Sequence, residues 1–120
     1  METRLVEKDG RQYVDCLPGG QLLTSEADAL DLVAACGEHG VPRLMLHAEN
    51  LSEAFYDLRT RLAGSVMLKF TNYWIKVAAV LPAERLQTGR FAEMAVETRL
   101  NREFRIFTDL AAAETWLLAD

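Results

Sequence analysis

Short apolar runs without polar alternation, separated by segments of helical pattern, constrain the fold of this chain more than any other feature. Leu44-Met45-Leu46 within Arg43–His47 and the Val, Ile and Ala residues of Trp74–Leu81 are continuous, which indicates strands buried on both faces. Phe104–Thr108 is a third, shorter run. Strands of this kind alternating with helices predict right-handed crossovers and a largely parallel sheet. The helices between and after them are expected at Leu62–Phe70, Phe91–Leu100 and Leu110–Leu118.

The N-terminal segment predicts a β-hairpin. Arg4–Lys8 and Gln12–Leu17 flank Asp9-Gly10, a dipeptide typical of a tight hairpin turn. This hairpin adds antiparallel strands to the parallel ones. We therefore predict a single α/β domain over residues 1–120, with a mixed, mostly parallel sheet of about five strands, the N-terminal hairpin and about four helices.

A further helix is predicted over Glu26–His39, between an N-cap at Ser25 and a terminating glycine at Gly40. Four of its residues recur at helical spacing and are expected to form one buried apolar stripe: Leu30, Val33, Ala34 and Gly37. The final helix is expected to begin at the N-cap Asp109 and to bury Ala113, Trp116 and Leu117.

The composition is that of one globular domain, and it argues against two classes of partner. Of the 120 residues 50% are hydrophobic, and 13 Lys and Arg against 18 Asp and Glu give a net charge of −5. A duplex-binding domain usually carries a basic stripe, whereas here basic residues are scattered among acidic ones, so we expect no nucleic-acid partner. The longest apolar run, Val77–Leu81, is too short to span a bilayer, so we expect no membrane partner.

The N-terminus and the cysteines favour a cytoplasmic protein. Met1–Arg4 lacks the charged-then-apolar pattern of a signal peptide. Cys16 and Cys36 form no CxxC motif and have no His at zinc-ligand spacing. Because each lies within a predicted element, we expect both thiols to be reduced and buried, and we expect no bound metal or other cofactor.

A polar segment, His47–Gly64, begins where the strand Arg43–His47 ends, at the place where α/β domains usually carry ligand sites. There the carboxyl ends of parallel strands meet the N-termini of the following helices. With the next helix expected to begin near Thr60, several polar side chains should share one rim. Our candidate binding residues are His47, Glu49, Asn50, Asp57 and Thr60.

Structural interpretations compete with the functional one for the same residues. Asn50 followed three residues later by Glu53 resembles a capping box. Asp57 or Thr60 would serve as a cap for the next helix, and a histidine at a strand end is often simply hydrogen-bonded. Gly64 within a helical pattern indicates close packing, because glycine costs a helix about 1 kcal/mol relative to alanine.

Recognised catalytic motifs are absent from the sequence. There is no GxSxG, P-loop, GxGxxG or HExxH pattern, and no Ser, Cys or Lys nucleophile with a matching base. We therefore predict no catalytic residue and favour a protein that is not an enzyme. His47, Glu49 and Asp57 leave a second hypothesis open, a small-molecule-binding protein or minor enzyme, since such groups bind metals or move protons.

The polar segment and its flanks resemble a known family. Leu46-His47-x-Glu49-Asn50-Leu51, then Phe55-x-Asp57-Leu58-x-Thr60-x-Leu62-Ala63-Gly64 and Lys69-Phe70-x-Asn72-Tyr73, is similar to the pattern of the bacterial domain-of-unknown-function family 4180. The resemblance runs from Ser25 to Trp116. Members typically have a Gly after the Thr and an acidic residue after the last Gly, where this chain has Arg61 and Ser65. The resemblance implies membership and no particular activity.

A more distant resemblance is to STAS domains, the anti-sigma-factor antagonist class. These domains also run strand, strand, helix, strand, helix, and they carry a hydroxyl residue at a helix start that a kinase partner phosphorylates. Asp57-Leu58-Arg59-Thr60 occupies a similar place with a different spacing. The resemblance implies a regulatory, protein-binding module that presents residues 50–64 to a partner, with Thr60 as the analogous hydroxyl. We also expect a homodimer, since small α/β domains often pair through a helix or an edge strand.

Overall fold

A five-stranded sheet with its strands in sequence order forms the centre of the molecule. The structure, a computed structural model, describes residues 1–119. β1 and β2 pair antiparallel, whereas β2, β3, β4 and β5 are parallel neighbours. The elements are β1 (Thr3–Lys8), β2 (Arg11–Cys16), α1 (Glu26–His39), β3 (Arg43–His47), α2 (Glu53–Tyr56), α3 (Leu62–Asn72), β4 (Lys76–Val80), α4 (Arg90–Glu97), β5 (Phe104–Phe107) and α5 (Leu110–Leu118). The predicted α/β fold with a mixed sheet and an N-terminal hairpin is confirmed.

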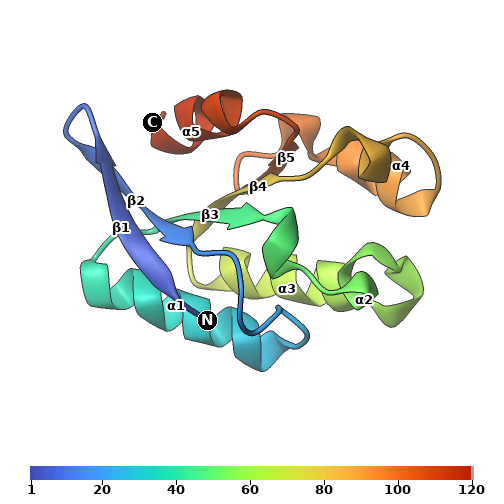
Figure 1. Cartoon of the computed structure of the whole chain (residues 1–120), viewed down its shortest axis with the longest axis horizontal. Coiled ribbons are helices and arrows are strands. Elements are labelled where there is room, and N and C mark those ends of the chain that lie inside the picture. Colours follow the sequence, from blue (N-terminus) through green and yellow to red (C-terminus); the bar gives the residue numbers. More distant parts are fainter. Residues whose placement is uncertain (120) are drawn as a thin grey trace.

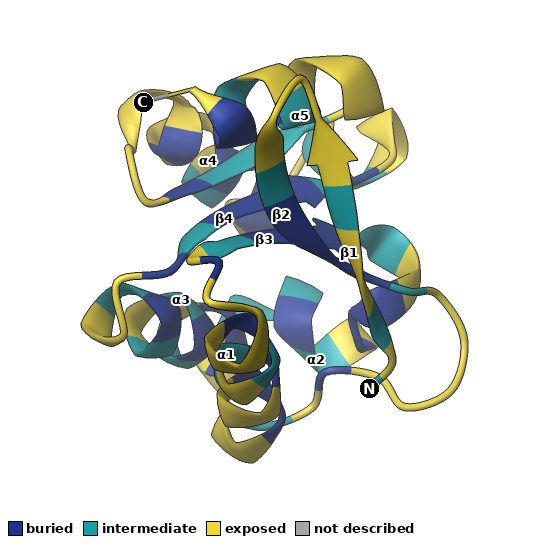
Figure 2. Ribbon diagram, turned by 90° about the vertical axis from the view of Figure 1, so that its left-hand side faces the viewer, coloured by how far each residue is buried: buried dark blue, intermediate teal, exposed yellow. Residues whose placement is uncertain are grey.

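Helices cover the two faces of this sheet unequally (Figure 1). α1 and α3 lie side by side on one face, and the larger core beneath them includes Val14, Leu44, Leu46, Val77, Ala79 and Phe104. α5 alone covers the other face, over a smaller core of Tyr13, Met45, Ala78, Ala113, Leu117 and Leu118. Successive residues of β3 therefore alternate between two cores, which explains why its apolar run is continuous. Figure 2 shows these buried strands between exposed outer helix faces.

The boundaries of α1 are as predicted, but its buried face is not. Ser25 Oγ accepts a hydrogen bond from the Asp28 N–H, and Gly40 ends the helix with a φ of 65°. The residues buried in α1 are Asp28, Ala29, Leu32 and Cys36, whereas Leu30, Ala34 and Gly37 of the predicted stripe are exposed. Burial free energy follows the apolar area removed from water, and the predicted stripe contained two residues, Ala34 and Gly37, that have little area to bury.

The start of one predicted strand and the number of helices differ from the prediction. β4 begins at Lys76, and Trp74 lies outside it with a φ of 61° and 87% of its surface exposed, because a left-handed residue cannot extend a strand. The polar segment contains a short helix, α2, so the described residues hold five α-helices rather than four. The last helix has the predicted bounds and the predicted N-cap, Asp109.

Both cysteines are free and buried, as predicted. Burial raises the pKa of the Cys16 thiol and of the Cys36 thiol to about 11. Both side chains belong to the larger core beneath α1 and α3. No helix in the described part of the chain is long and apolar enough to cross a membrane.

Candidate functional site

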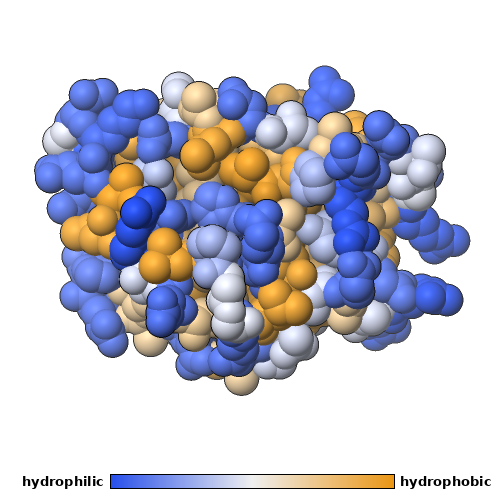
Figure 3. Space-filling view, viewed as in Figure 1, coloured by the Kyte–Doolittle hydropathy of each residue, from blue (hydrophilic) through white to orange (hydrophobic). Residues whose placement is uncertain are grey.

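The candidate site lies at the carboxyl ends of β3 and β4, at the right-hand end of Figure 1. The polar segment forms three turns there before α3 begins. A 3-10 helix at Ala48–Asn50 is followed by α2 and then by a second 3-10 helix at Leu58–Thr60. Hydrophilic side chains gather over α2 and α4 at this end of the surface (Figure 3).

The His47 side chain pairs with the sheet. Its Nε2 lies 2.6 Å from Oδ1 of Asp15, and Nε of Arg4 lies 3.6 Å from the other oxygen of the same carboxylate. Arg4, Asp15 and His47 thus form a charged row across β1, β2 and β3. The hydrogen bond with Asp15 raises the pKa of His47, although burial opposes the shift. Asp15 was not predicted as a site residue, because its contact with His47 depends on the pairing of two strands distant in sequence.

Asn50 is buried and ties the polar segment to the rest of the fold. Its Oδ1 accepts a hydrogen bond from the His47 N–H at 2.8 Å, and its Nδ2 donates to the Leu17 carbonyl at 2.9 Å. Its own carbonyl accepts from the Leu23 N–H at 2.7 Å. The predicted capping box with Glu53 is wrong, because the Asn50 amide bonds the main chain of β3 and of the segment after β2. The N-cap of α2 is Ser52.

Asp57 caps the 3-10 helix that precedes α3. Its Oδ1 accepts a hydrogen bond from the Arg59 N–H at 3.1 Å. The same carboxylate pairs with the Arg59 guanidinium, whose Nε and Nη2 lie 3.0 Å and 2.9 Å from its two oxygens. Hydrogen bonds from Arg59 hold the pKa of Asp57 below its usual range. Asp57 therefore fixes the turn, and its charge is already matched by a neighbour.

The Thr60 hydroxyl also stabilises this turn through hydrogen bonds, although the residue is exposed. It lies 2.6 Å from the Ala54 carbonyl and 2.8 Å from the Asp57 carbonyl, either of which accepts its proton. It accepts in return from the Leu62 N–H at 3.2 Å. α3 begins one residue after Arg61, whose φ is 64°. The Thr60 hydroxyl thus has a structural role at the start of α3, although the N-cap itself is Arg61. The helix begins at Leu62, the first residue of the predicted range.

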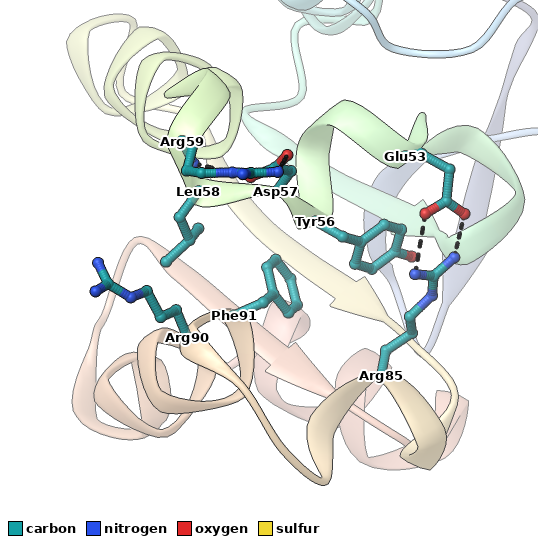
Figure 4. Close-up of a pocket in the computed structure, with 8 residues that line it drawn as sticks. All are labelled: Glu53, Tyr56, Asp57, Leu58, Arg59, Arg85, Arg90 and Phe91. Atoms are coloured by element: carbon teal, nitrogen blue, oxygen red, sulfur yellow. Dashed lines mark hydrogen bonds and ion pairs between the residues drawn. The ribbon is translucent and has the colours of Figure 1, made fainter.

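A polar pocket of about 680 Å³ opens between α2 and α4 (Figure 4). Arg85 lies at one side of it, with its guanidinium bonded to the Glu53 carboxylate and stacked 3.9 Å from the centre of the Tyr56 ring. The centre of the Phe91 ring lies 5.0 Å from that of Tyr56, and Phe91 also lines the pocket. The hydrogen bond from Arg85 lowers the pKa of Glu53. Because Glu53 pairs with Arg85 and Asp57 with Arg59, the pocket is rich in charge but largely neutralised.

An apolar groove of about 640 Å³ lies on the other side of this turn, between α3 and α4. Its apolar lining residues are Leu58, Ala63, Gly64, Met67, Leu68 and Met94, and we call it the α3 groove. Leu68 is 60% exposed there. The predicted close packing of Gly64 is wrong, because a Cβ built on it would meet no atom within 4 Å. Sequence patterns did not identify this groove, because Met94 reaches it from a separate helix.

The five predicted binding residues do not converge on one cavity. Asp57 and Thr60 lie together at the turn before α3, whereas His47 pairs with Asp15 and the buried Asn50 holds the backbone. Glu49 is exposed on the Ala48–Asn50 turn. Of the polar pocket's lining, only Asp57 comes from the predicted set. Within residues 1–119, no group of three or more His, Cys, Asp or Glu side chains could hold a metal ion.

Comparison with known proteins identifies a family for the chain. The family described as Domain of unknown function (DUF4180) matches residues 8–117. That range contains β2 to β5, α1 to α4, most of α5, and all five predicted binding residues. No curated protein and no solved structure matches the chain. The match confirms the resemblance seen in the polar segment, and the chain belongs to the family Domain of unknown function (DUF4180).

Proposed function

We propose that this chain is a non-enzymatic, regulatory protein-binding module of STAS-like type, which binds its partner at the α3 groove. Two features support a module of this type: the order of strands and helices, and the position of Thr60 just before α3. The observation that carries the proposal is the open apolar groove beside that helix start. Exposed apolar surface that borders polar residues is typical of protein-binding sites.

Gly64 strengthens this interpretation of the groove. A glycine within a helix costs up to about 1 kcal/mol relative to alanine. Packing within the chain does not require a glycine at position 64, since an added Cβ would meet open space. Glycine is favourable where a second backbone approaches closely, and Gly64 lines the groove. A partner element that packs against the first turn of α3 would explain the residue.

The lining and its charge favour an amphipathic helix with an acidic residue at one end. Met67, Leu68 and Met94 provide apolar side chains, and methionine suits surfaces that receive helices. Arg61 is the charged residue in the described lining of the groove, whereas the adjoining hollow beside Leu58 and Met94 has Arg90 together with Glu93 and Glu97. Arg61 is exposed, so an acidic residue at one end of the partner helix would pair with it.

The alternative is a small-molecule-binding protein or minor enzyme that uses a rim of His47, Glu49 and Asp57. It has less support, because these three side chains line no common cavity. The polar pocket beside Asp57 also has most of its charge paired internally. We therefore keep the binding module as the proposed function.

The test compares the exposed Leu68, inside the groove, with the exposed Leu100 outside it. Wild type, Leu68→Glu and the control Leu100→Glu are immobilised and used to capture proteins from the native cell extract. Captured proteins are then cross-linked to wild type, and the bound segment is mapped by mass spectrometry. We expect Leu68→Glu to lose a protein that Leu100→Glu retains, because a buried charge would oppose docking. The cross-linked segment should be an amphipathic helix with an acidic residue at one end, attached to α3 or α4.

Three results would contradict the proposal. The first is equal capture by all three proteins. The second is a captured protein that cross-links away from α3 and α4. The third is a wild-type dimer that Leu68→Glu converts to a monomer in sedimentation, which would make a second copy of this chain the occupant. Thr60→Glu is a poorer test, because the Thr60 hydroxyl maintains the turn.

A further inference from the structure

A second groove lies at the opposite end of the sheet, where β3 and β4 begin. This end faces the viewer in Figure 2. The groove has a volume of about 710 Å³, within the range of about 300–1,000 Å³ that small-molecule sites occupy. We call it the amino-end groove, and the residues that give it its chemistry are Arg43, Trp74, Lys76, Arg102, Arg105 and Trp116. In α/β domains ligands usually bind at the carboxyl ends of the strands, so the fold class does not predict a site at the amino ends.

The charge of the amino-end groove is opposite to that of the whole chain. The chain has 13 basic and 18 acidic residues, yet the described lining includes four basic residues and no acidic one. Glu103, next to Arg102 in sequence, is exposed and is not part of the lining. Within residues 1–119, the guanidinium groups of Arg43 and Arg102 have neither a hydrogen bond nor an ion pair. Such a concentration of positive charge in an acidic protein favours an anionic ligand.

One wall of the groove is already ordered around Trp116. The Lys76 ammonium lies 4.4 Å from the centre of the indole ring and donates to the Trp116 and Ala119 carbonyls at 2.7 Å and 3.0 Å. The Arg105 guanidinium lies 5.0 Å from the same ring, and its Nε donates to the Asn101 carbonyl. This wall is therefore preorganised, which lowers the entropic cost of binding.

Trp74, which also lines the groove, has an unusual backbone conformation. Its backbone is left-handed, with a φ of 61°, a conformation that a bulky residue rarely adopts. Its side chain is 87% exposed, so the ring contributes little to the core. A residue that is both strained and exposed commonly marks a functional site. An exposed indole face beside unpaired arginines is suited to stacking on a planar ring.

We propose that the amino-end groove binds a nucleoside polyphosphate. The base stacks on Trp74, and the phosphates pair with Arg43 and Arg102, whose planar groups match phosphate geometry. Because stacking on an indole tolerates every base, the site does not select strongly among nucleotides. This site is separate from the α3 groove, because the two grooves share no lining residue.

The test uses the two indole N–H signals in the NMR spectrum, since both tryptophans of the chain line the groove. ATP is titrated, and adenosine, tripolyphosphate and a single-stranded oligo(dA) are titrated separately. Trp74→Asn removes the ring and suits the left-handed backbone, and Arg102→Gln removes one exposed charge. Arg99→Gln is the control, because Arg99 is exposed and lies outside the groove.

We expect ATP to shift both indole signals saturably, and adenosine and tripolyphosphate to bind at least about tenfold more weakly. Trp74→Asn and Arg102→Gln should each weaken ATP binding by about tenfold, whereas Arg99→Gln should not. Leu68→Glu should bind ATP normally, which separates this site from the proposed function. The proposal fails if ATP causes no saturable shift or if tripolyphosphate binds as tightly as ATP. It also fails if Arg99→Gln weakens ATP binding as much as Arg102→Gln, or if oligo(dA) outcompetes ATP.

Discussion

The His47 imidazole lies 2.6 Å from the Asp15 carboxylate, and this contact joins the ends of two neighbouring parallel strands. Arg4 approaches the same carboxylate from β1 at 3.6 Å. His47 is half-buried, and its hydrogen bond with Asp15 outweighs burial in raising its pKa. The charged form of the imidazole is therefore favoured by folding, which gives the stability of the protein a defined dependence on pH.

We expect this pair to contribute stability that decreases as the pH rises. The folded-state pKa of His47 lies above its unfolded value, so the contribution is complete below about pH 6.5 and is lost as the pH rises through the raised folded value. The measurement is the free energy of unfolding of wild type and His47→Gln from acidic to alkaline pH. The difference should be largest at the acidic end. His39 is present in both proteins, so its contribution cancels. Asp15→Asn should show the same weakened dependence of the free energy of unfolding on pH as His47→Gln. Parallel pH profiles for wild type and His47→Gln would contradict the prediction.

Arg61→Gly should stabilise the protein by about 1 kcal/mol. Arg61 has a φ of 64°, a conformation that costs an L-residue about 1–2 kcal/mol and that glycine adopts freely. Part of this gain is offset, because glycine increases the conformational entropy of the unfolded chain. Chemical denaturation of both proteins measures the effect. Gly40→Ala is the reciprocal control, since Gly40 has a φ of 65° and should lose about 1 kcal/mol. A lower stability for Arg61→Gly would mean that the arginine side chain makes a contact worth more than the strain.

The elements that local chemistry determines could be predicted from the sequence. Ser25 and Asp109 cap their helices as expected, because a capping side chain bonds backbone groups two or three residues away. Asp9-Gly10 makes the expected hairpin turn, with both residues at positive φ. Continuous apolar runs also identified the parallel strands correctly. For the caps and the turn, the deciding interaction lies within a few residues in the sequence, whereas the apolar runs reflect burial on both faces of the sheet.

The site was less predictable, because its contacts join distant segments. Asn50 and Glu53 have capping-box spacing, but the Asn50 amide instead bonds Leu17, which reaches it only once β2 and β3 pair. The Gly64 pattern suggested packing within the chain, and only the structure shows that the space beside it is open. Trp74 looked like the start of a strand, since residue type alone does not reveal a left-handed backbone.

Asn50→Ala should destabilise the protein by about 2–4 kcal/mol. The change leaves the part-buried His47 N–H and Leu17 carbonyl without the Asn50 amide, and an unsatisfied buried group costs about 1–3 kcal/mol. Asn72→Ala is the control, because Asn72 is exposed at the end of α3. Denaturation of both variants gives the free energies. Hydrogen exchange of the Leu23 N–H should also accelerate in Asn50→Ala, since Leu23 donates to the Asn50 carbonyl. Equal stabilities for the two variants would show that water replaces the lost bonds.

Both cysteine thiols should resist alkylation until the protein unfolds. Cys16 and Cys36 are 0% and 2% exposed, and burial raises the pKa of each to about 11, so the reactive thiolate is scarce at neutral pH. Cys16→Ser and Cys36→Ser each leave one thiol, and the alkylation rate is followed by mass spectrometry with increasing denaturant. The two rates should rise together with global unfolding, because both thiols belong to one core. A thiol that reacts without denaturant as fast as a free cysteine would contradict its burial. A disulfide between the two in wild type would contradict the expectation of a reduced, cytoplasmic protein.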